Sequence, residues 1–304
     1  MFKKFLTVAL SFVVFLGIMP SEASGNSRMP ISIYVNDKEI YTDSGAYIEN
    51  GTTYIPIRAI SNGMGVEDIS WDGVSRKATV RGYSKLEFYI GKNYAYVNGE
   101  KKKMSEKAVI KNGRTMIPLR FFAENSDADV EWDNTLYAVK VTKAGVNVPL
   151  RYRANGYTSD DVMWLSRIVH AESEGEPVNG QIAVANVVLN RVKNSEYPNT
   201  IYGVIFDHNY GVQFQPVANG TIYNKPSLKS VYAAKQAVNG ENHAGESLYF
   251  LNEKIATNFW IVNNRKYYKT INILPFLFLS IIFPYFSIFE LLYQKILPFS
   301  SFSC

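Results

Sequence analysis

One stretch decides how the second half of this 304-residue chain folds: TSDDVMWLSRIVHAESEGEP, residues 158–177. Thr158 can cap a helix, and the two aspartates in its first turn are favoured by the helix dipole. Apolar residues then recur at helical spacing: Val162, Trp164, Leu165, Ile168 and Val169. Glu172 comes next on this face, and Gly175 and Pro177 end the helix. A carboxyl placed where a core residue belongs, beside a turn, is typical of a general acid at the mouth of a cleft.

A second helix is predicted over 181–192, because a nearly continuous apolar run is typical of a buried central helix. Asn186 and Asn190 lie four apart and share a face, and buried asparagines must be hydrogen-bonded. For Asn186 we expect a polar network that orients the loop carrying Glu172. For Asn190 we leave two roles open, the same polar network and direct contact with substrate. Arg191 either pairs with a nearby acid or is a solvated helix end.

The N-terminus has the pattern of a secretory signal. Two lysines precede the apolar run 5–19, and Ser21 and Ala23 provide small residues for cleavage. We therefore expect a signal peptide over 1–23, with a retained anchor as the alternative; both predict export. The only cysteine is Cys304, so no disulfide can form within the chain. The net charge of +5 suits an anionic cell wall but decides little.

An internal repeat organises the first half. The segment 54–58 returns at 116–120, an offset of 62 residues, and the Trp-Asp pair at 71 returns at 132. Each copy predicts a hairpin with an Asn-Gly turn, a short helix after a proline, and two strands around the Trp-Asp pair. The tryptophans are expected in the core, and a surface platform for carbohydrate is the alternative.

The segment 31–143 resembles the copper amine oxidase-like N-terminal domain of bacterial surface proteins, through its Ile-Pro-Leu-Arg signature and Trp-Asp pair. The resemblance implies a β-rich stalk that acts as a spacer or wall-binding module. Oxidase chemistry is not expected, because it needs a cluster of copper-binding histidines. The chain's three histidines are widely spaced: His170, His208 and His243. We expect no metal and no cofactor.

The motifs HAESEGEP at 170–177 and GQIAVANVVLNRV at 180–192 resemble the catalytic domain of SleB-like spore cortex-lytic cell wall hydrolases. Shorter matches follow in order: 198–200, 203–206, 217–220 and 248–250. We place this domain at 158–271, after a linker at 144–157. The resemblance implies a lysozyme-like fold similar to that of lytic transglycosylases. The fold class expected for the chain is thus α+β, a duplicated β-rich stalk followed by this domain.

The resemblance also implies cleavage of peptidoglycan between N-acetylmuramic acid and N-acetylglucosamine, with Glu172 as the catalytic acid. A single glutamate suffices if the muramic 6-hydroxyl replaces water and gives a 1,6-anhydro product. Burial should raise the pKa of Glu172. Substrate contacts are expected from six further residues: Glu176, Gln181, Asn190, Gln213, Phe214 and Tyr249. The alternatives are a muramidase that gives reducing ends and a non-catalytic wall-binding protein.

Residues 272–304 are rich in phenylalanine and isoleucine and contain three prolines. We expect that a shifted reading frame replaced the C-terminus here, so that the domain lacks its last strand. A membrane anchor and a buried extension are the alternatives. The expected partners are peptidoglycan strands, with membrane association through this tail and no nucleic acid. The expected location is the cell wall, cell surface or spore envelope.

Overall fold

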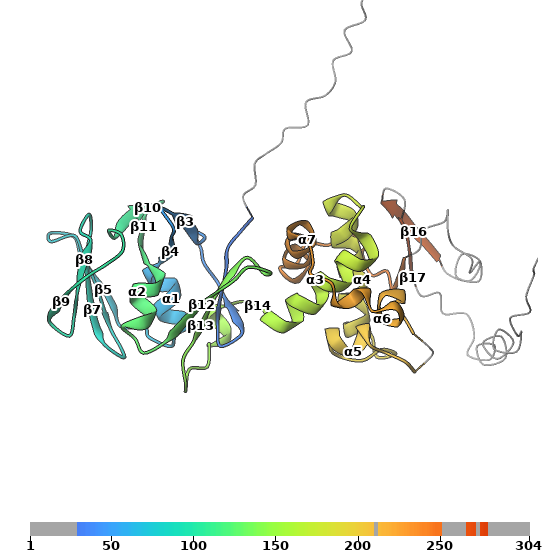
Figure 1. The fold of residues 1–304 in the computed structure, drawn as a ribbon, viewed down its shortest axis with the longest axis horizontal. Coiled ribbons are helices and arrows are strands. Elements are labelled where there is room, and N and C mark those ends of the chain that lie inside the picture. The colour runs from blue at the N-terminus through green and yellow to red at the C-terminus, as the bar shows by residue number, and fades with distance from the viewer. Residues whose placement is uncertain (1–28, 210–211, 251–265, 272–273, 279–304) are drawn as a thin grey trace, which may run out of the picture.

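The computed structural model describes residues 29–209, 212–250, 266–271 and 274–278 (Figure 1). A β-rich stalk is followed by a mainly helical domain, which confirms the α+β class predicted from the sequence. The expected signal peptide and most of the C-terminal tail lie outside the described residues. Within the described part of the chain, no helix is both long and apolar enough to cross a membrane. The same residues contain no cluster of three or more side chains that could hold a metal ion.

The two copies of the repeat meet in the centre of the stalk. There β4 (Thr52–Pro56) pairs antiparallel with β11 (Arg114–Pro118), and the equivalent residues Ile55 and Ile117 lie opposite each other. Each copy has the predicted hairpin, in which both residues of the Asn-Gly turn have positive φ. The two short helices begin directly after prolines, whose fixed φ suits a helix start: α1 (Ile57–Gly63) and α2 (Leu119–Glu124).

The stalk contains three sheets. The central sheet has the order β10-β11-β4-β3 and includes β3 (Tyr47–Glu49) and β10 (Val109–Lys111). The second follows chain order: β5 (Ile69–Asp72), β6 (Lys77–Arg81), β7 (Lys85–Tyr89), β8 (Tyr94–Val97) and β9 (Glu100–Lys103). The third has the order β12-β13-β1-β2-β14: β1 (Ser32–Val35), β2 (Lys38–Ile40), β12 (Asp129–Asp133), β13 (Ala138–Thr142) and β14 (Arg153–Thr158).

The predicted linker is part of the fold. A 3-10 helix, η1 (Leu150–Tyr152), leads into β14, which pairs with β2 of the stalk. Buried stalk side chains also join the hydrophobic core of the helical domain: Tyr34, Leu136 and Ala138. The segment predicted as a linker, 144–157, thus contributes η1 and most of β14 to the fold. The sequence could not reveal this, because the partner strand lies more than 100 residues earlier.

Helices α3 (Ser159–Ser173) and α4 (Val178–Lys193) form the centre of the second domain and pack with α7 (Leu228–Val238). Thr158 caps α3 as predicted: its hydroxyl accepts from the Asp161 amide at 3.1 Å, and its own amide donates to the Asp161 carboxylate at 2.9 Å. Shorter helices complete the domain: α5 (Ile201–Ile205), α6 (Gln215–Asn219) and η2 (Thr221–Tyr223).

A three-stranded sheet follows the helices, in the order β15-β17-β16: β15 (Tyr249–Phe250), β16 (Lys266–Ile271) and β17 (Leu274–Phe278). β17 is the central strand and pairs antiparallel with both neighbours. This corrects the prediction that the domain ends at residue 271 without a last strand. An apolar run that looked foreign to the domain supplies the strand that joins its sheet.

Candidate functional site

Glu172 lies in the last turn of α3, half-buried, as the helical spacing predicted. Burial raises the pKa of its carboxyl from 4.5 to about 7, against the opposing effect of the positive charge on Arg191. Loss of water disfavours the charged form of an acid, so this carboxyl can hold a proton near neutral pH. The raised pKa predicted from the sequence is thus confirmed.

Arg191 is the charged group that faces Glu172 from α4, and only 6% of its surface is exposed. Its Nε donates to the Leu248 carbonyl at 2.9 Å. Three rings surround its guanidinium carbon at 5.1–5.5 Å: Tyr197, Phe214 and Tyr249. Its Nη1 has no hydrogen-bond partner among the described residues. The sequence predicted either an ion pair or a solvated helix end for Arg191, and the structure shows neither. Arg191 is a buried cation among the rings of Tyr197, Phe214 and Tyr249, which we call the aromatic box.

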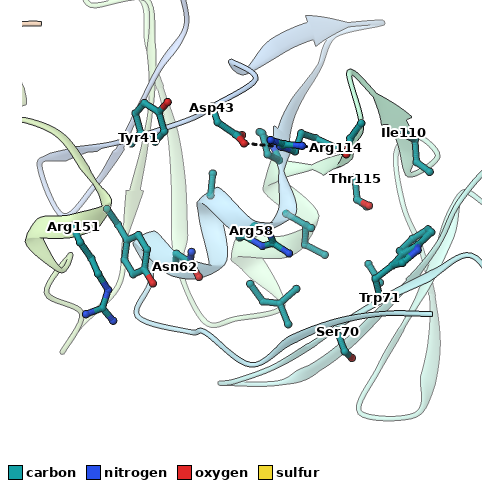
Figure 2. A pocket seen from close by; sticks show the side chains of 17 residues that line it. Tyr41, Asp43, Arg58, Asn62, Ser70, Trp71, Ile110, Arg114, Thr115 and Arg151 are labelled. Atoms are coloured by element: carbon teal, nitrogen blue, oxygen red, sulfur yellow. Dashed lines mark hydrogen bonds and ion pairs between the residues drawn. The ribbon is translucent and has the colours of Figure 1, made fainter. Parts of the chain in front are cut away.

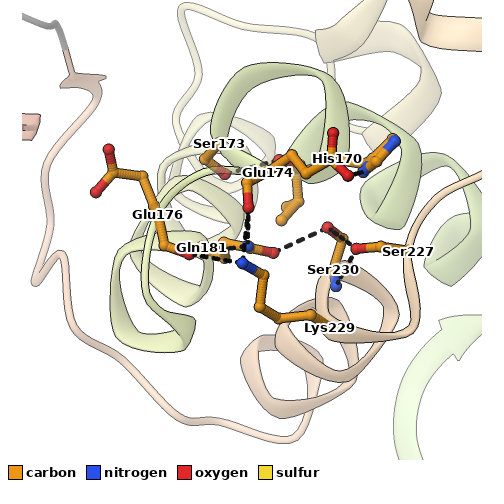
Figure 3. A network of polar contacts seen from close by, with 9 residues as sticks. His170, Ser173, Glu174, Glu176, Gln181, Ser227, Lys229 and Ser230 are labelled. Carbon is orange, nitrogen blue, oxygen red and sulfur yellow. Dashed lines mark hydrogen bonds and ion pairs between the residues drawn. The ribbon is translucent and has the colours of Figure 1, made fainter.

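Two side chains hold the turn between α3 and α4 by donating hydrogen bonds to its backbone carbonyl groups (Figure 3). Gln181 is fully buried, and its Nε2 donates to the carbonyls of Glu174 and Glu176, both at 3.1 Å. Lys229 of α7 donates to the same two carbonyls, at 2.7 and 3.1 Å. Ser230 donates to Gln181 Oε1 at 2.9 Å. This geometry favours a positioning role for Gln181, which fixes the turn that follows Glu172, over the predicted contact with substrate.

The two neighbouring acids lie on different sides of this turn. Glu176 is buried where α4 begins, and its amide donates to the Ser173 carbonyl at 2.9 Å. The Glu174 side chain is 64% exposed and lies 3.8 Å from His170 Nδ1. Glu174 thus points away from the buried face. The Nδ1 atom of His170 has no hydrogen-bond partner within the described part of the chain.

Asn186 and Asn190 both bind the segment that follows α7. Asn186 donates to the Glu241 carbonyl at 2.8 Å and accepts from the His243 amide at 2.9 Å. Asn190 donates to the carbonyls of Gly245 and Ser247, both at 2.9 Å. The polar network predicted for Asn186 exists, but it orients this later segment and not the loop that carries Glu172.

The remaining candidates are aromatic or lie beside aromatic residues. Phe214 is buried against Arg191, a packing position, and Gln213 next to it is half-buried. The Tyr249 hydroxyl accepts from Tyr197 at 3.0 Å. A second aromatic group was missed: Trp164 of α3 contacts three rings with centroids 5.2–6.1 Å away, those of Tyr202, Phe206 and Tyr223. Tyr202 and Tyr223 are exposed, so this group forms an aromatic surface.

Two family profiles match the chain: the copper amine oxidase N-terminal domain over residues 34–141 and Cell Wall Hydrolase over 175–277. The cell wall hydrolase CwlJ of Halalkalibacterium halodurans is 34% identical over 99 residues, which cover 31% of this chain and 68% of CwlJ. The chain belongs to the cell wall hydrolase family. The spore cortex-lytic enzyme of Bacillus cereus is 43% identical over 117 residues, 38% of this chain and 42% of that enzyme.

This cell wall hydrolase therefore spans less than half of the cortex-lytic relative that it matches. Among solved structures, the catalytic domain of the germination-specific lytic transglycosylase SleB from Bacillus anthracis is 41% identical. That match covers 40% of this chain and 98% of the SleB domain, with a TM-score of 0.38. The family profile begins at Gly175, so the role of Glu172 rests on its geometry.

Sequence reasoning about the cell wall hydrolase domain missed the aromatic box around Arg191. Its three rings come from positions 197, 214 and 249, which are far apart in the chain. One signal was present: an arginine lies in the last turn of a helix that the apolar run predicts to be buried. A buried cation needs partners, so that position could have been marked as a site.

Proposed function

We propose that this cell wall hydrolase cleaves peptidoglycan glycan strands between N-acetylmuramic acid and N-acetylglucosamine as a lytic transglycosylase, with Glu172 as its acid and base. The observation that carries the proposal is the half-buried Glu172 carboxyl, whose pKa burial raises to about 7. A carboxylic acid that keeps its proton near neutral pH can protonate a glycosidic oxygen. The family of the chain supports the choice of substrate.

The reaction needs two proton transfers, and Glu172 takes part in both. Protonated Glu172 donates to the glycosidic oxygen, the bond from that oxygen to muramic C1 breaks, and positive charge builds on the muramic ring. The Glu172 carboxylate then accepts the proton of the muramic 6-hydroxyl, whose oxygen bonds to C1. The products are a 1,6-anhydromuramic end and a free N-acetylglucosamine hydroxyl, and Glu172 regains its proton.

Arg191 supports the second half of this cycle. Its buried positive charge lowers the pKa of Glu172 in opposition to burial, so it stabilises the carboxylate that forms after proton donation. Its Nε bond to Leu248 and its three rings fix that charge in place. Arg191 is thus a positioning residue that adjusts Glu172.

Mass analysis of the muropeptides released from purified wall tests the proposal. The wild-type chain should create 1,6-anhydro ends, and Glu172→Gln should create none. Glu174→Gln is the matched control, because it changes an exposed carboxyl on the same turn. Reducing ends would identify a muramidase instead. Wall binding without new ends from the wild-type chain would identify a non-catalytic binding protein.

We also propose that the enzyme acts outside the membrane, at the cell wall or spore envelope. Relatives named as spore cortex-lytic enzymes and cell wall hydrolases support this location. Parallel digests of purified spore cortex and vegetative wall would show which polymer it prefers, from the yield of anhydro ends at equal substrate mass.

A further inference from the structure

The stalk contains a cleft of about 620 Å³ that none of the chemistry above uses (Figure 2). Residues of α1 and β5 in the first copy of the repeat line it, together with the β10–β11 hairpin of the second copy and η1. Its side chains include Tyr41, Arg58 and Trp71. We propose that this cleft binds a carboxylated saccharide, with the Trp71 ring against a sugar face and the Arg58 guanidinium on the carboxylate.

The duplication supplies an internal comparison. A smaller cleft of about 280 Å³ lies at the equivalent place in the second copy, lined by Arg120 and Trp132 and by the β3–β4 hairpin. Arg120 corresponds to Arg58 at an offset of 62, and Trp132 corresponds to Trp71 at an offset of 61. Each copy of the repeat therefore has an arginine and a tryptophan at equivalent positions in a cleft.

In the second cleft both side chains are engaged. Arg120 pairs with Glu124 at 3.4 Å and donates to the Val130 carbonyl at 3.2 Å. Trp132 donates to Asn134 at 2.8 Å and contacts the Tyr137 ring edge-on at 5.1 Å. Intramolecular partners thus take up the groups that a ligand would need.

In the first cleft each of the three side-chain partners is replaced. Asn62 stands where the second copy has Glu124, Gly73 stands for Asn134, and Arg76 stands for Tyr137. Arg58 is exposed and has no ion pair or hydrogen bond to any side chain in the described ranges. Trp71 is 48% exposed, although the sequence predicted it in the core. Both groups are available to a ligand here and not in the second copy.

The other charges of the cleft are already neutralised. Arg114 Nε donates to Asp43 at 2.6 Å, and Arg151 pairs with Glu67. The charge left for a ligand is therefore that of Arg58, which favours an anion. A guanidinium binds a carboxylate through two parallel hydrogen bonds, and an exposed indole ring offers an apolar face with a polar edge, which suits a sugar ring.

A carboxylated saccharide can come from two sources in a wall: N-acetylmuramic acid of the glycan strand where its lactyl carboxyl carries no stem peptide, or a uronic acid of another wall polymer. The choice of wall saccharides rests on the proposed function, but binding in the stalk does not require that Glu172 be catalytic. The monosaccharides contain no bond that the proposed enzyme cleaves. Loss of cleavage with retained sugar binding, or the reverse, would separate failure of one proposal from failure of the other.

Isothermal titration calorimetry of the full chain tests the cleft. The probes are N-acetylmuramic acid, glucuronic acid and uncharged N-acetylglucosamine. We expect a carboxylated sugar to bind about tenfold more tightly than N-acetylglucosamine, the effect of one charge-assisted pair. The tighter of the two acids identifies the source. Equal binding of all three sugars, or binding of none, would overturn the proposal.

Variants locate the binding. Arg58→Gln should remove the preference for the acids, and Trp71→Ala should weaken every sugar about tenfold. Arg120→Gln, the equivalent change in the second copy, should alter neither. Arg58→Lys keeps the charge without the planar fork and should retain part of the preference. Affinities unchanged in both Arg58→Gln and Trp71→Ala would place the sugar elsewhere and refute this site.

Discussion

The pH dependence of cleavage should report the balance between burial and Arg191 at Glu172. A pKa raised from 4.5 to about 7 favours the protonated acid by about 3 kcal/mol. At pH 7 about half of the molecules hold the proton, against about one in 300 for an ordinary glutamate. The alkaline limb of kcat/KM for glycan cleavage should therefore fall with a midpoint near pH 7.

Arg191→Met removes the charge and keeps a long side chain among the three rings. An opposite charge nearby typically lowers a carboxyl pKa by 1–3 units, so its loss should raise the pKa of Glu172 by roughly one unit. The alkaline limb should move up with it, while kcat below the limb falls because the carboxylate formed after proton donation is less stable. At pH 8 the protonated fraction should rise about fivefold, from about 9% to about half.

Two measurements make this decisive. Initial rates of anhydro-end formation give the limb, and a carbon-13 titration of the carboxyl, assigned with Glu172→Gln, gives the pKa without relying on activity. Arg191→Lys keeps the charge and should leave the midpoint of the alkaline limb within a few tenths of a pH unit. Arg167→Met, which removes another arginine from the same domain, is the control for loss of a positive charge elsewhere. A Glu172 pKa that is ordinary in the wild-type chain, or unchanged in Arg191→Met, would refute the reasoning.

Three further substitutions test a buried lysine, the turn after Glu172 and the exposed aromatic group. Lys235 is almost fully buried, and burial lowers its pKa from 10.5 to about 8. Below pH 8 the buried charge therefore lowers the free energy of unfolding by about 3 kcal/mol. This cost fades as the pH rises towards 10.5, where the lysine loses its proton in the unfolded chain as well. Lys235→Met should therefore raise the free energy of urea unfolding at pH 7 more than at pH 10, and a loss of stability at pH 7 would contradict this. Gln181→Leu should cost about 2–3 kcal/mol and lower kcat, because it leaves Ser230 and two turn carbonyls with fewer partners; an unchanged unfolding midpoint would show that the turn does not need it. Tyr223→Ala, on the exposed aromatic group around Trp164, should raise KM about tenfold if a sugar stacks there, with unfolding unchanged within about 1 kcal/mol; equal KM values would exclude such a contact.

Local features of this chain followed from its sequence. The Asn-Gly turns, the helix starts after Pro56 and Pro118, and the cap at Thr158 each depend on neighbours within a few residues. Glu172 was found for the same reason, because its face of α3 is set by helical spacing alone.

Features that depend on distant partners were not predictable in this way. The segment before α3 looked like a linker because its own composition is polar, yet its strand β14 is fixed by pairing with β2. The run Leu274–Phe278 looked foreign because it is apolar throughout, yet a central strand needs such residues. The exposure of Trp71 likewise depends on what the duplication changed at positions 73 and 76.

In the proposed reaction a single glutamate acts first as an acid and then as a base, so its pKa must be neither very high nor very low. Burial without a cation would keep the proton on Glu172 and make the carboxylate a costly product. A direct ion pair would hold the carboxylate and leave no proton to donate. Among the residues that the structure describes, Glu172 and Arg191 form no ion pair within bonding distance, yet each acts on the other electrostatically. The Leu248 carbonyl and the aromatic box hold Arg191, and its charge opposes the effect of burial on the pKa of Glu172 without such an ion pair.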